Sequence, residues 1–542
     1  MQIEKIQVGD KKVWPFTIPS GIITTQVSSL DKLAREVPEL GVLTTKSIGP
    51  EPKAGNREPI LAQYSPGCFV NAVGLTNPGV EEFSKELNQY EIPKDKFLLA
   101  SIFGKDTKEF VYVSRTLEEQ VDGFELNLSC PHAKGYGMQL GQDPAIVYEI
   151  TKAVVSGTKK PVFAKLTPNA GNIGEIAKSS VDAGAYGIVA INTVGPGYHS
   201  VHGNPVLTNK VGGLSGTGII PIGLKCVREV RQAVGNKVPI IGMGGMRTVR
   251  DIEEYAKSGT TIFGIGSGLA GMTDDNIKRY FAAVIDDLRN NGQSENSSEF
   301  LQEVDMNYRK VNIEDVLNSG CDFKIFKTNA AIQAGPGQFV FAWIPGIGEK
   351  PFSVMDDDPL TLGVQEVGEF TRAFNGLKNG DFFYVRGPYG QKINDNVVNG
   401  QRVSLVGGGC GIAGLYLLAK KFDRSQVRTF LGAKNKTHLP YLDEFKKYGE
   451  VFVATEDGSL GQRGVVTDLF NRNEFDNTQV FFNCGPKAMV GAVLPLETKV
   501  SGSENIYSSV DYMTRCGVGV CGSCADPKGR RTCVEGPFVN NL

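Results

Sequence analysis

The fold of the first half is decided by residues 162–193, VFAKLTPNAGNIGEIAKSSVDAGAYGIVAINT. The stretch opens with an apolar run, 162–166, continues with the amphipathic segment 173–183, and closes with a second apolar run from Gly187. Short apolar runs bounded by turn residues are typical of buried parallel strands, and an amphipathic segment between two of them is typical of a crossover helix. The stretch therefore predicts one strand–helix–strand unit.

The same alternation continues on both sides, up to about residue 285. Similar apolar runs begin at Val111, Phe124, Pro239 and Ile262, and further amphipathic segments cover 145–155 and 222–233. Repeated units of this size favour an α/β fold of the (β/α)8, or TIM, barrel type. In such barrels the chemistry takes place at the carboxyl ends of the strands.

The charge balance argues against a basic nucleic-acid surface, because 57 Lys and Arg stand against 59 Asp and Glu. Charged residues stand within the first five positions, and the apolar core of a secretory signal is not seen there. No apolar run reaches the roughly eighteen residues of a membrane span. We therefore expect a cytoplasmic protein whose partners are small molecules, with no nucleic acid and no membrane.

At 542 residues the chain is too long for one core, and we expect four domains. Residues 286–299 are polar and predict a linker after the first domain, 1–290. A period close to two over 306–395 favours a small antiparallel β-barrel in a domain spanning 303–398. Strand–helix alternation returns in a third domain, 399–498, and the last domain, 499–542, is rich in cysteine.

Four cysteines of the tail form the strongest motif: Cys516, Cys521, Cys524 and Cys533. Clustered cysteines in a chain without a secretory signal are typical of metal ligation rather than of disulfides. The spacing C-x4-C-x2-C with a further cysteine is that of a plant-type [2Fe–2S] ligand set, although the last interval is shorter here. A structural zinc site is the alternative, but such sites usually pair C-x2-C knuckles.

A glycine-rich turn predicts a nucleotide site in the third domain. Residues 403–415, VSLVGGGCGIAGL, lead from an apolar strand through the turn into a helix. Such a turn lets a pyrophosphate approach backbone N–H groups at the positive end of the helix dipole, although similar turns also serve packing. The residues expected to approach the dinucleotide are Gly407, Gly408, Gly409 and Gly411.

Asparagines recur near the ends of candidate strands of the first domain, at Asn71, Asn127 and Asn192. Carboxamides supply paired donors and acceptors, which suit a planar cyclic amide or ureide such as a pyrimidine. Cys130 follows closely and could remove a carbon-bound proton as a thiolate. Taken singly, each asparagine could be a turn or cap residue and the cysteine a buried apolar residue.

Two glycine-rich stretches, 242–246 and 264–268, end the seventh and eighth candidate strands. The loops at these positions commonly bind phosphate in (β/α)8 enzymes. Lys46 and Lys165 offer cations that would stabilise the anion formed when a flavin accepts hydride.

Roughly residues 10–285 resemble the catalytic subunit of class 1 dihydroorotate dehydrogenases. The motifs that carry the resemblance occur in the same order: Thr45-Lys-Ser, Gly55-Asn, Asn71-Ala-Val-Gly-Leu-Thr-Asn-Pro-Gly, Asn127-Leu-Ser-Cys-Pro, Lys165-Leu-Thr-Pro-Asn, Ile191-Asn-Thr and Gly212-Gly-Leu-Ser-Gly. The resemblance implies FMN contacts at Ser20, Lys46, Ser47, Lys165, Gly216, Gly244, Gly245, Gly266 and Ser267. It implies that Cys130 is the catalytic base, that Lys46 takes part in catalysis, and that orotate contacts Asn71, Asn127, Asn192 and Thr193.

Roughly residues 303–542 resemble the electron-transfer subunit of the NAD-dependent enzymes, a member of the ferredoxin–NADP reductase superfamily. Arg515-Cys-Gly-Val-Gly-Val-Cys-Gly-Ser-Cys and Cys533-Val-Glu-Gly-Pro match its cluster loop, including the short last interval. The resemblance implies a ferredoxin reductase-like module with a [2Fe–2S] cluster on the four cysteines. It also implies FAD contacts at Pro351, Phe352, Ser353, Gly368 and Thr371.

Three positions depart from the pattern: Lys350 replaces an Arg, Ser101 stands where relatives often have an Asn, and His132 replaces an Asn. Cys130-Pro-His also resembles the pyrimidine-reducing domain of dihydropyrimidine dehydrogenase. One alternative is therefore an enzyme of that kind, acting on uracil or thymine. Another is a non-enzymatic flavin and iron–sulfur electron carrier.

The two resemblances together imply a fusion of two subunits that are usually separate. Dihydroorotate would be oxidised to orotate at FMN, a step of pyrimidine biosynthesis. The electrons would then pass through the [2Fe–2S] cluster and FAD to NAD⁺. Barrel relatives of this class form dimers, so the resemblance implies a homodimer.

Overall fold

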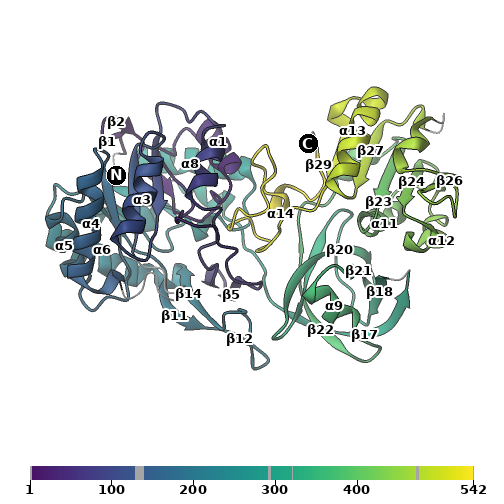
Figure 1. Ribbon diagram of the computed structural model, residues 1–542, viewed down its shortest axis with the longest axis horizontal. Helices are drawn as coiled ribbons and strands as arrows, with labels where there is room; N and C mark the ends of the chain where they lie inside the picture. The colour runs from purple at the N-terminus through teal and green to yellow at the C-terminus, as the bar shows by residue number, and fades with distance from the viewer. Residues whose placement is uncertain (1–2, 129–139, 291–293, 320–321, 472–474, 541–542) are drawn as a thin grey trace. The chain divides into compact units, whose positions relative to one another are not determined.

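The computed structural model describes residues 3–128, 140–290, 294–319, 322–471 and 475–540. The chain forms two compact units (Figure 1). The first unit holds Met1–Asp305 with Val518–Arg530, and the second holds Met306–Gly517 with Arg531–Leu542. The cysteine-rich tail therefore contributes residues to both units.

The first unit is built on a closed barrel of eight strands that pair in parallel. The strands are β3 (Phe16–Ile18), β4 (Val42–Thr44), β7 (Phe97–Ile102), β8 (Gly123–Asn127), β9 (Val162–Lys165), β10 (Gly187–Ala190), β15 (Ile240–Met243) and β16 (Ile262–Gly264). The helices that follow them in turn are α1 (Val27–Glu36), α2 (Val80–Leu87), α3 (Thr107–Leu117), α4 (Pro144–Gly157), α5 (Ile173–Asp182), α6 (Ile220–Val234), α7 (Val249–Lys257) and α8 (Asp274–Arg289). The predicted (β/α)8 barrel is confirmed.

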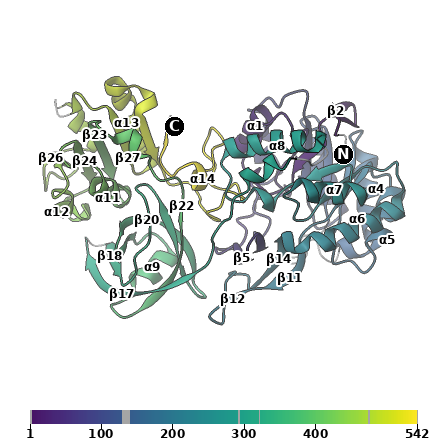
Figure 2. The same ribbon diagram turned by 180° about the vertical axis from the view of Figure 1, so that it is seen from behind.

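Helices surround the barrel, with α4 and α5 at the left edge of Figure 1 and α7 and α8 in front in Figure 2. The barrel interior is a separate apolar core, to which Leu99, Phe163, Val189 and Ile241 contribute. A larger core lies between the strands and the helices. Strand side chains alternate between these two cores because successive residues of a strand point to opposite faces.

One predicted strand is wrong: Val111 and its neighbours lie on helix α3. Phe110, Val113 and Leu117 are buried at helical spacing, and the Asp106 carboxylate accepts a hydrogen bond from the Glu109 N–H, which caps the helix. The third barrel strand is instead β7, in which all six residues are buried.

A four-stranded antiparallel sheet projects from the barrel, in the order β11-β14-β6-β5. Its strands are β5 (Leu61–Ser65), β6 (Cys68–Asn71), β11 (Val194–Tyr198) and β14 (Val211–Gly216). Two pairs of short strands, β1 (Ile6–Val8) with β2 (Lys11–Val13) and β12 (Ser200–Val201) with β13 (Asn204–Pro205), complete the strands of this unit. Asn71 ends β6 and Thr193 immediately precedes β11, so this sheet helps to position both residues.

The predicted linker, 286–299, is wrong in its first part, because α8 runs to Arg289. Asp287 is fully buried and accepts hydrogen bonds from the Ser294 hydroxyl, at 2.8 Å, and from the N–H groups of Asn296 and Ser297. The polar residues of this stretch therefore bind a buried carboxylate at the end of the helix.

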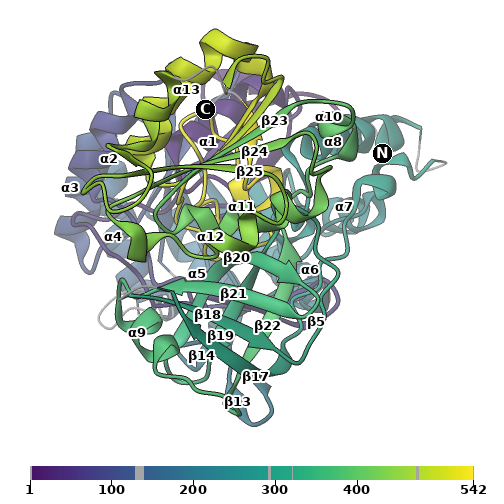
Figure 3. The ribbon, with the colours of Figure 1, turned by 90° about the vertical axis from the view of Figure 1, so that its right-hand side faces the viewer.

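The second unit begins with a closed antiparallel barrel in the order β17-β18-β21-β20-β19-β22, which confirms the predicted small barrel (Figure 3). Its strands are β17 (Arg309–Asn318), β18 (Phe323–Thr328), β19 (Phe339–Ile344), β20 (Gly348–Asp357), β21 (Leu360–Gln365) and β22 (Phe382–Tyr389). The short helix α9 (Glu369–Asn375) packs its Phe374 against Phe326, Phe352 and Phe383 of this barrel.

A seven-stranded sheet follows, in the order β26-β25-β24-β23-β27-β28-β29, and all its pairs are parallel except the last. The strands are β23 (Val403–Gly408), β24 (Val427–Ala433), β25 (Glu450–Thr455), β26 (Gln462–Arg463), β27 (Val480–Cys484), β28 (Ile506–Ser509) and β29 (Val539–Asn540). Its helices are α11 (Gly411–Lys421), α12 (Leu442–Phe445) and α13 (Lys487–Ser501), and the short helices α10 (Asp395–Val398) and α14 (Thr532–Glu535) lie before and after them in the chain. The tail supplies β28 and β29 and so completes this sheet.

Among the described residues, none of the helices is both long enough and apolar enough to cross a membrane.

Candidate active site

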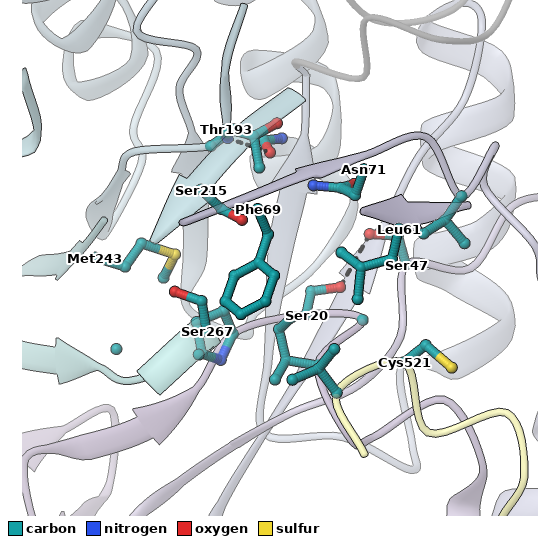
Figure 4. A pocket seen from close by; sticks show the side chains of 18 of the residues that line it. Ser20, Ser47, Leu61, Phe69, Asn71, Thr193, Ser215, Met243, Ser267 and Cys521 are labelled. Atoms are coloured by element: carbon teal, nitrogen blue, oxygen red, sulfur yellow. Dashed lines mark hydrogen bonds between the residues drawn. The ribbon is translucent and has the colours of Figure 1, made fainter. Parts of the chain in front are cut away.

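A cavity opens at the carboxyl ends of the strands of the first barrel (Figure 4). Its lining includes the predicted residues Ser20, Lys46, Ser47, Asn71, Asn127, Lys165, Asn192, Thr193, Gly244, Gly245, Gly266 and Ser267. The structure thus brings together all the predicted FMN and substrate contacts except Gly216. The predicted base, Cys130, and the neighbouring His132 lie outside the described residues.

Ser47 is the centre of a hydrogen-bond network at the cavity. Its hydroxyl lies 3.0 Å from the Ser20 hydroxyl (Figure 4). It also accepts a bond of 2.9 Å from Nδ2 of Asn127 and lies 2.8 Å from the Ser101 hydroxyl. Ser101, one of the departures noted in the sequence, takes part in the same network. The network connects the loops after β3 and β4 with the ends of β7 and β8.

The other two predicted asparagines are also held in place. Nδ2 of Asn71 donates to the Gly213 carbonyl at 3.1 Å, across the β6–β14 pair. The Asn192 side chain approaches Oδ1 of Asn127 with its Nδ2, at 3.5 Å, and its own Oδ1 accepts the Thr193 N–H at 2.8 Å. Protein contacts therefore fix the orientation of these carboxamides at the cavity, as recognition of a flat polar ring requires.

Two buried lysines line the cavity. Lys46 follows β4, and its ammonium nitrogen approaches Gly21 of the β3–α1 loop. Lys165 ends β9, and its Nζ is 3.2 Å from Oε1 of Glu125 on the neighbouring strand β8. Buried ammonium groups beside a cavity suit a ligand that is, or becomes, negatively charged.

Glycines after β15 form a close-packed wall that a side chain would disrupt. Gly244 and Gly245 have φ of +141° and +90°, which other residues rarely adopt. A Cβ on Gly245 would overlap the carbonyl oxygen of Gly216, which places that predicted residue beside the wall. Tyr255 supports the same turn, because its hydroxyl donates to the Gly244 carbonyl at 2.8 Å. Burial raises the pKa of Tyr255, so this donor stays protonated.

Several lining residues were not predicted, among them Leu61, Phe69, Ser215, Met243, Val520 and Cys521. Three of them had a signal in the sequence. Phe69 lies two residues before Asn71 on one strand and so shares its face. Ser215 and Met243 belong to glycine-rich stretches named above. The contact of Glu125 with Lys165 could not be predicted from the sequence, because it depends on how β8 and β9 pair.

The segment 518–530 packs on the first barrel and places Val520 and Cys521 at the cavity. The Ile23 N–H donates to the Val520 carbonyl at 2.8 Å, and the Thr25 hydroxyl donates to the Cys521 carbonyl at 2.6 Å. Ser28 and Ser29 hold the segment further along through the carbonyls of Asp526 and Gly529.

The four tail cysteines are all buried and none forms a disulfide. Cys521 and Cys524 belong to the first unit, whereas Cys516 and Cys533 belong to the second. Over the described part of the chain, the structure shows no group of three or more His, Cys, Asp or Glu side chains placed to hold a metal ion. The cluster ligands therefore stay a prediction.

The predicted FAD residues lie on two elements of the small barrel. Pro351, Phe352 and Ser353 are on β20, where they pair with β19, and Gly368 and Thr371 lie at the start of α9. The Thr371 hydroxyl accepts the N–H of Gly368 at 3.0 Å, which shapes this turn.

The predicted NAD glycines lie at the turn from β23 to α11, at the carboxyl edge of the parallel sheet. A Cβ on Gly414, one turn into α11, would stand 3.2 Å from the Ser353 hydroxyl and 3.3 Å from the Cys484 sulfur. The predicted FAD strand and the predicted NAD turn are therefore neighbours within the second unit. Burial raises the pKa of Cys484 to about 12, so its thiol stays protonated.

A fully buried ion pair supports the start of the cysteine segment. The guanidinium of Arg386 binds both carboxylate oxygens of Glu349 at 2.7 Å, and its remaining nitrogen donates to the Cys516 carbonyl at 2.9 Å. The Tyr308 hydroxyl donates to the same carboxylate, and the centroid of the Phe341 ring lies 4.0 Å from the guanidinium carbon of Arg386. Although burial opposes the charge, Glu349 holds the pKa of Arg386 well above its ordinary value.

Comparison with known proteins finds relatives for the part of the chain that forms the first barrel. The family model "Dihydroorotate dehydrogenase" matches residues 8–288. The catalytic subunit of dihydroorotate dehydrogenase B (NAD(+)) from Methanocaldococcus jannaschii is 42% identical over 279 residues, which cover 51% of this chain and 90% of that subunit. Its counterpart from Pyrococcus abyssi is 42% identical over 259 residues, which cover 47% and 83%. A solved NADH-dependent reduced ferredoxin–NADP oxidoreductase is 29% identical with a TM-score of 0.39, covering 43% of this chain and 88% of that one.

The family match spans more than half of the chain and coincides with the barrel that carries the cavity. The order of the sequence motifs, the eight-stranded parallel barrel and the polar lining at its carboxyl rim agree with that match. The chain belongs to the dihydroorotate dehydrogenase family.

Proposed function

We propose that the chain oxidises dihydroorotate to orotate at an FMN in the first barrel and delivers the electrons to NAD⁺ through a [2Fe–2S] cluster and FAD. One observation carries the proposal. A single cavity is lined by the buried lysines, the three asparagines, the glycine turns and Cys521 of the tail.

The cavity residues fit FMN. Its phosphate would lie against the turns at Gly244–Gly245 and Gly266–Ser267, where backbone N–H groups and the Ser267 hydroxyl offer donors. The lysines, Lys46 and Lys165, would lie by the pyrimidine edge of the ring, where a cation favours a negative charge. FMN supplies the hydride acceptor when it is bound.

The substrate would be held by Asn71, Asn127, Asn192 and Thr193. The carboxamides of the three asparagines are fixed by protein contacts and can match the donors and acceptors of a pyrimidine ring. We propose Cys130 as the base that takes a proton from C5 of dihydroorotate while hydride leaves C6. Cys130 follows Asn127 by three residues in the chain.

The tail cysteines suit a cluster in their chemistry: all four are buried thiols, and Gly517, Gly519 and Gly522 between them have positive φ. We propose that Cys516, Cys521, Cys524 and Cys533 hold the [2Fe–2S] group. The position of Cys521 at the cavity supports electron exchange with a flavin bound there. FAD would be held by Pro351, Phe352, Ser353, Gly368 and Thr371, and NAD by Gly407, Gly408, Gly409 and Gly411. A homodimer and a cytoplasmic location stay predictions.

The experiment combines composition with turnover. The purified chain should contain FMN, FAD, iron and acid-labile sulfide, and dihydroorotate added without oxygen should bleach its flavin. It should then reduce NAD⁺, and Cys130→Ala should abolish bleaching while it leaves the cofactor content unchanged. Bleaching by dihydrouracil in preference to dihydroorotate would contradict the substrate, and zinc in place of iron would contradict the electron route.

A further inference from the structure

A buried ion pair lies at the inner end of the cavity wall in the first barrel. Nζ of Lys165 is 3.2 Å from Oε1 of Glu125, and the two side chains are 6% and 1% exposed. In the strand register Lys165 on β9 stands opposite Asn127 on β8, so Glu125 lies two residues further from the rim. Lys165 lines the cavity and Glu125 does not.

Packing does not explain a glutamate at this position. Glu125 shares its strand face with Asn127 and stands opposite Phe163, which belongs to the apolar core inside the barrel. A carboxylate removed from water is costly unless it is paired and hydrogen-bonded, and an apolar side chain of similar size would often be at least as stable there. The pair is therefore better explained by what the carboxylate does to the lysine.

We propose that Glu125 is a positioning residue that holds the Lys165 ammonium in place at the FMN ring. The proposal rests on the FMN site of the proposed function. The lysine stem is flexible, so its ammonium could take more than one position. Glu125 holds the ammonium from the neighbouring strand, without lining the cavity itself.

The consequence is electrostatic. A cation at the ring stabilises the negative charge that develops when FMN accepts hydride. Glu125→Gln keeps the shape of the side chain but removes the ion pair that holds the Lys165 ammonium. The ammonium should then move away from the ring, and this should outweigh the loss of one nearby negative charge, so two-electron reduction of FMN should become roughly tenfold less favourable. For a two-electron couple this corresponds to a midpoint potential about 30 mV lower.

The test is a cycle of three variants in the full-length holoenzyme: Glu125→Gln, Lys165→Gln and the double variant. FMN potentials are measured by anaerobic dye-coupled titration, and the flavin couple that Lys165→Gln shifts is assigned to FMN. Each single variant should lower the potential. The double variant should lie no lower than Lys165→Gln alone, because Glu125 acts only through Lys165.

Asp122→Asn is the matched control. It breaks the pair of Lys11 with Asp122, at 2.7 Å, just before β8 begins. Loss of this pair should leave the FMN potential unchanged. An unchanged potential in Glu125→Gln, or a further drop in the double variant, would overturn the inference. If Glu125→Gln alone fails to fold, comparison of the uncharged double variant with Lys165→Gln still decides the point, since a neutral pair leaves no buried charge unmatched.

The potentials and the substrate reaction separate the two proposals. A wild-type FMN that dihydroorotate does not bleach, combined with the expected shifts, contradicts the proposed function and supports the role of Glu125. Normal bleaching without any shift contradicts the role of Glu125 alone. A protein that binds no FMN contradicts both.

Discussion

The hydroxyl of Thr25 donates a hydrogen bond of 2.6 Å to the carbonyl of Cys521, a residue 496 positions further along the chain. Ile23 of the same β3–α1 loop donates to the Val520 carbonyl, and a Cβ on Gly522 would overlap the Ile23 carbonyl. This loop also supplies Ser20 to the cavity. A single loop thus carries a predicted flavin contact and holds a predicted cluster ligand.

We expect Thr25→Val to loosen the segment 518–530 on the first barrel. The change keeps the shape of the side chain and removes one hydrogen bond, worth about 1 kcal/mol. The Ile23 N–H, which is bonded to Val520, should then exchange with solvent several-fold faster by mass spectrometry or NMR. Thr116→Val is the control, because its hydroxyl binds the Tyr112 carbonyl on an exposed face of α3. Equal exchange in both variants would contradict the prediction.

The glycine wall gives a second prediction, for FMN content. In Gly245→Ala the new methyl group would overlap the Gly216 carbonyl and the backbone would be strained at φ +90°. Gly235→Ala is the matched control: φ is +75° there, but nothing lies within 4 Å of the new Cβ. Both variants should lose roughly 1–2 kcal/mol through strain, whereas only Gly245→Ala should lose FMN, measured by absorbance after gel filtration. Equal FMN content in the two variants would show that the turn does not contact the cofactor.

Strand length alone does not decide which barrel strands the sequence predicts. The three-residue strand β16 was predicted, whereas β3 and β4, of the same length, were not. The six buried residues of β7 were missed as well, and a strand was placed at Val111 instead. The run at Val111 misleads because β-branched and aromatic residues favour strands, while the buried positions of α3 recur at helical spacing.

The residues of the candidate site also differ in how far the sequence predicts them. Asn127 and Lys165 belong to motifs at strand ends, so their place at the cavity could be predicted from the sequence. Glu125 becomes significant only when β8 and β9 pair and place its carboxylate against Lys165. Cys521 reaches the cavity through contacts across almost the whole chain, and no local pattern encodes such a contact.

The third prediction concerns Arg386. Arg386→Met would leave Glu349 buried without its partner, and breaking a buried pair in this way costs about 3–5 kcal/mol. It would also remove the donor to the Cys516 carbonyl, so iron content should fall together with the stability of the second unit. Denaturant unfolding and an iron assay measure the two effects.

Arg372→Met is the control for this change, because Arg372 forms an exposed pair with Glu366, worth roughly 0–1 kcal/mol. Glu349→Met added to Arg386→Met should recover much of the stability but not the iron, since the Cys516 carbonyl still lacks its donor. Full iron content in that double variant would show that the guanidinium does not position the segment.

The last prediction is a pH dependence in the second unit. Burial raises the pKa of Glu497 to about 8, although Asn483 binds one of its oxygens at 2.6 Å. The other carboxylate oxygen and Oδ1 of Asn483 are buried without partners in the described structure. Since the unfolded glutamate ionises near its ordinary pKa of about 4.3, the unfolded state loses this proton first. The free energy of unfolding should therefore fall as the pH rises towards 8, and level off above it.

Glu497→Gln removes this titration and offers an N–H donor that can reach the unpaired Asn483 oxygen. We expect little change in stability at pH 5 and a gain on the order of a few kcal/mol at pH 8.5, because each pKa unit corresponds to about 1.36 kcal/mol. Denaturant titrations of the second unit at the two pH values measure the difference. Glu504→Gln, an exposed glutamate in the same unit, should keep the wild-type slope. If Glu497→Gln keeps that slope as well, Glu497 is ionised in the folded protein and the assignment of its proton is wrong.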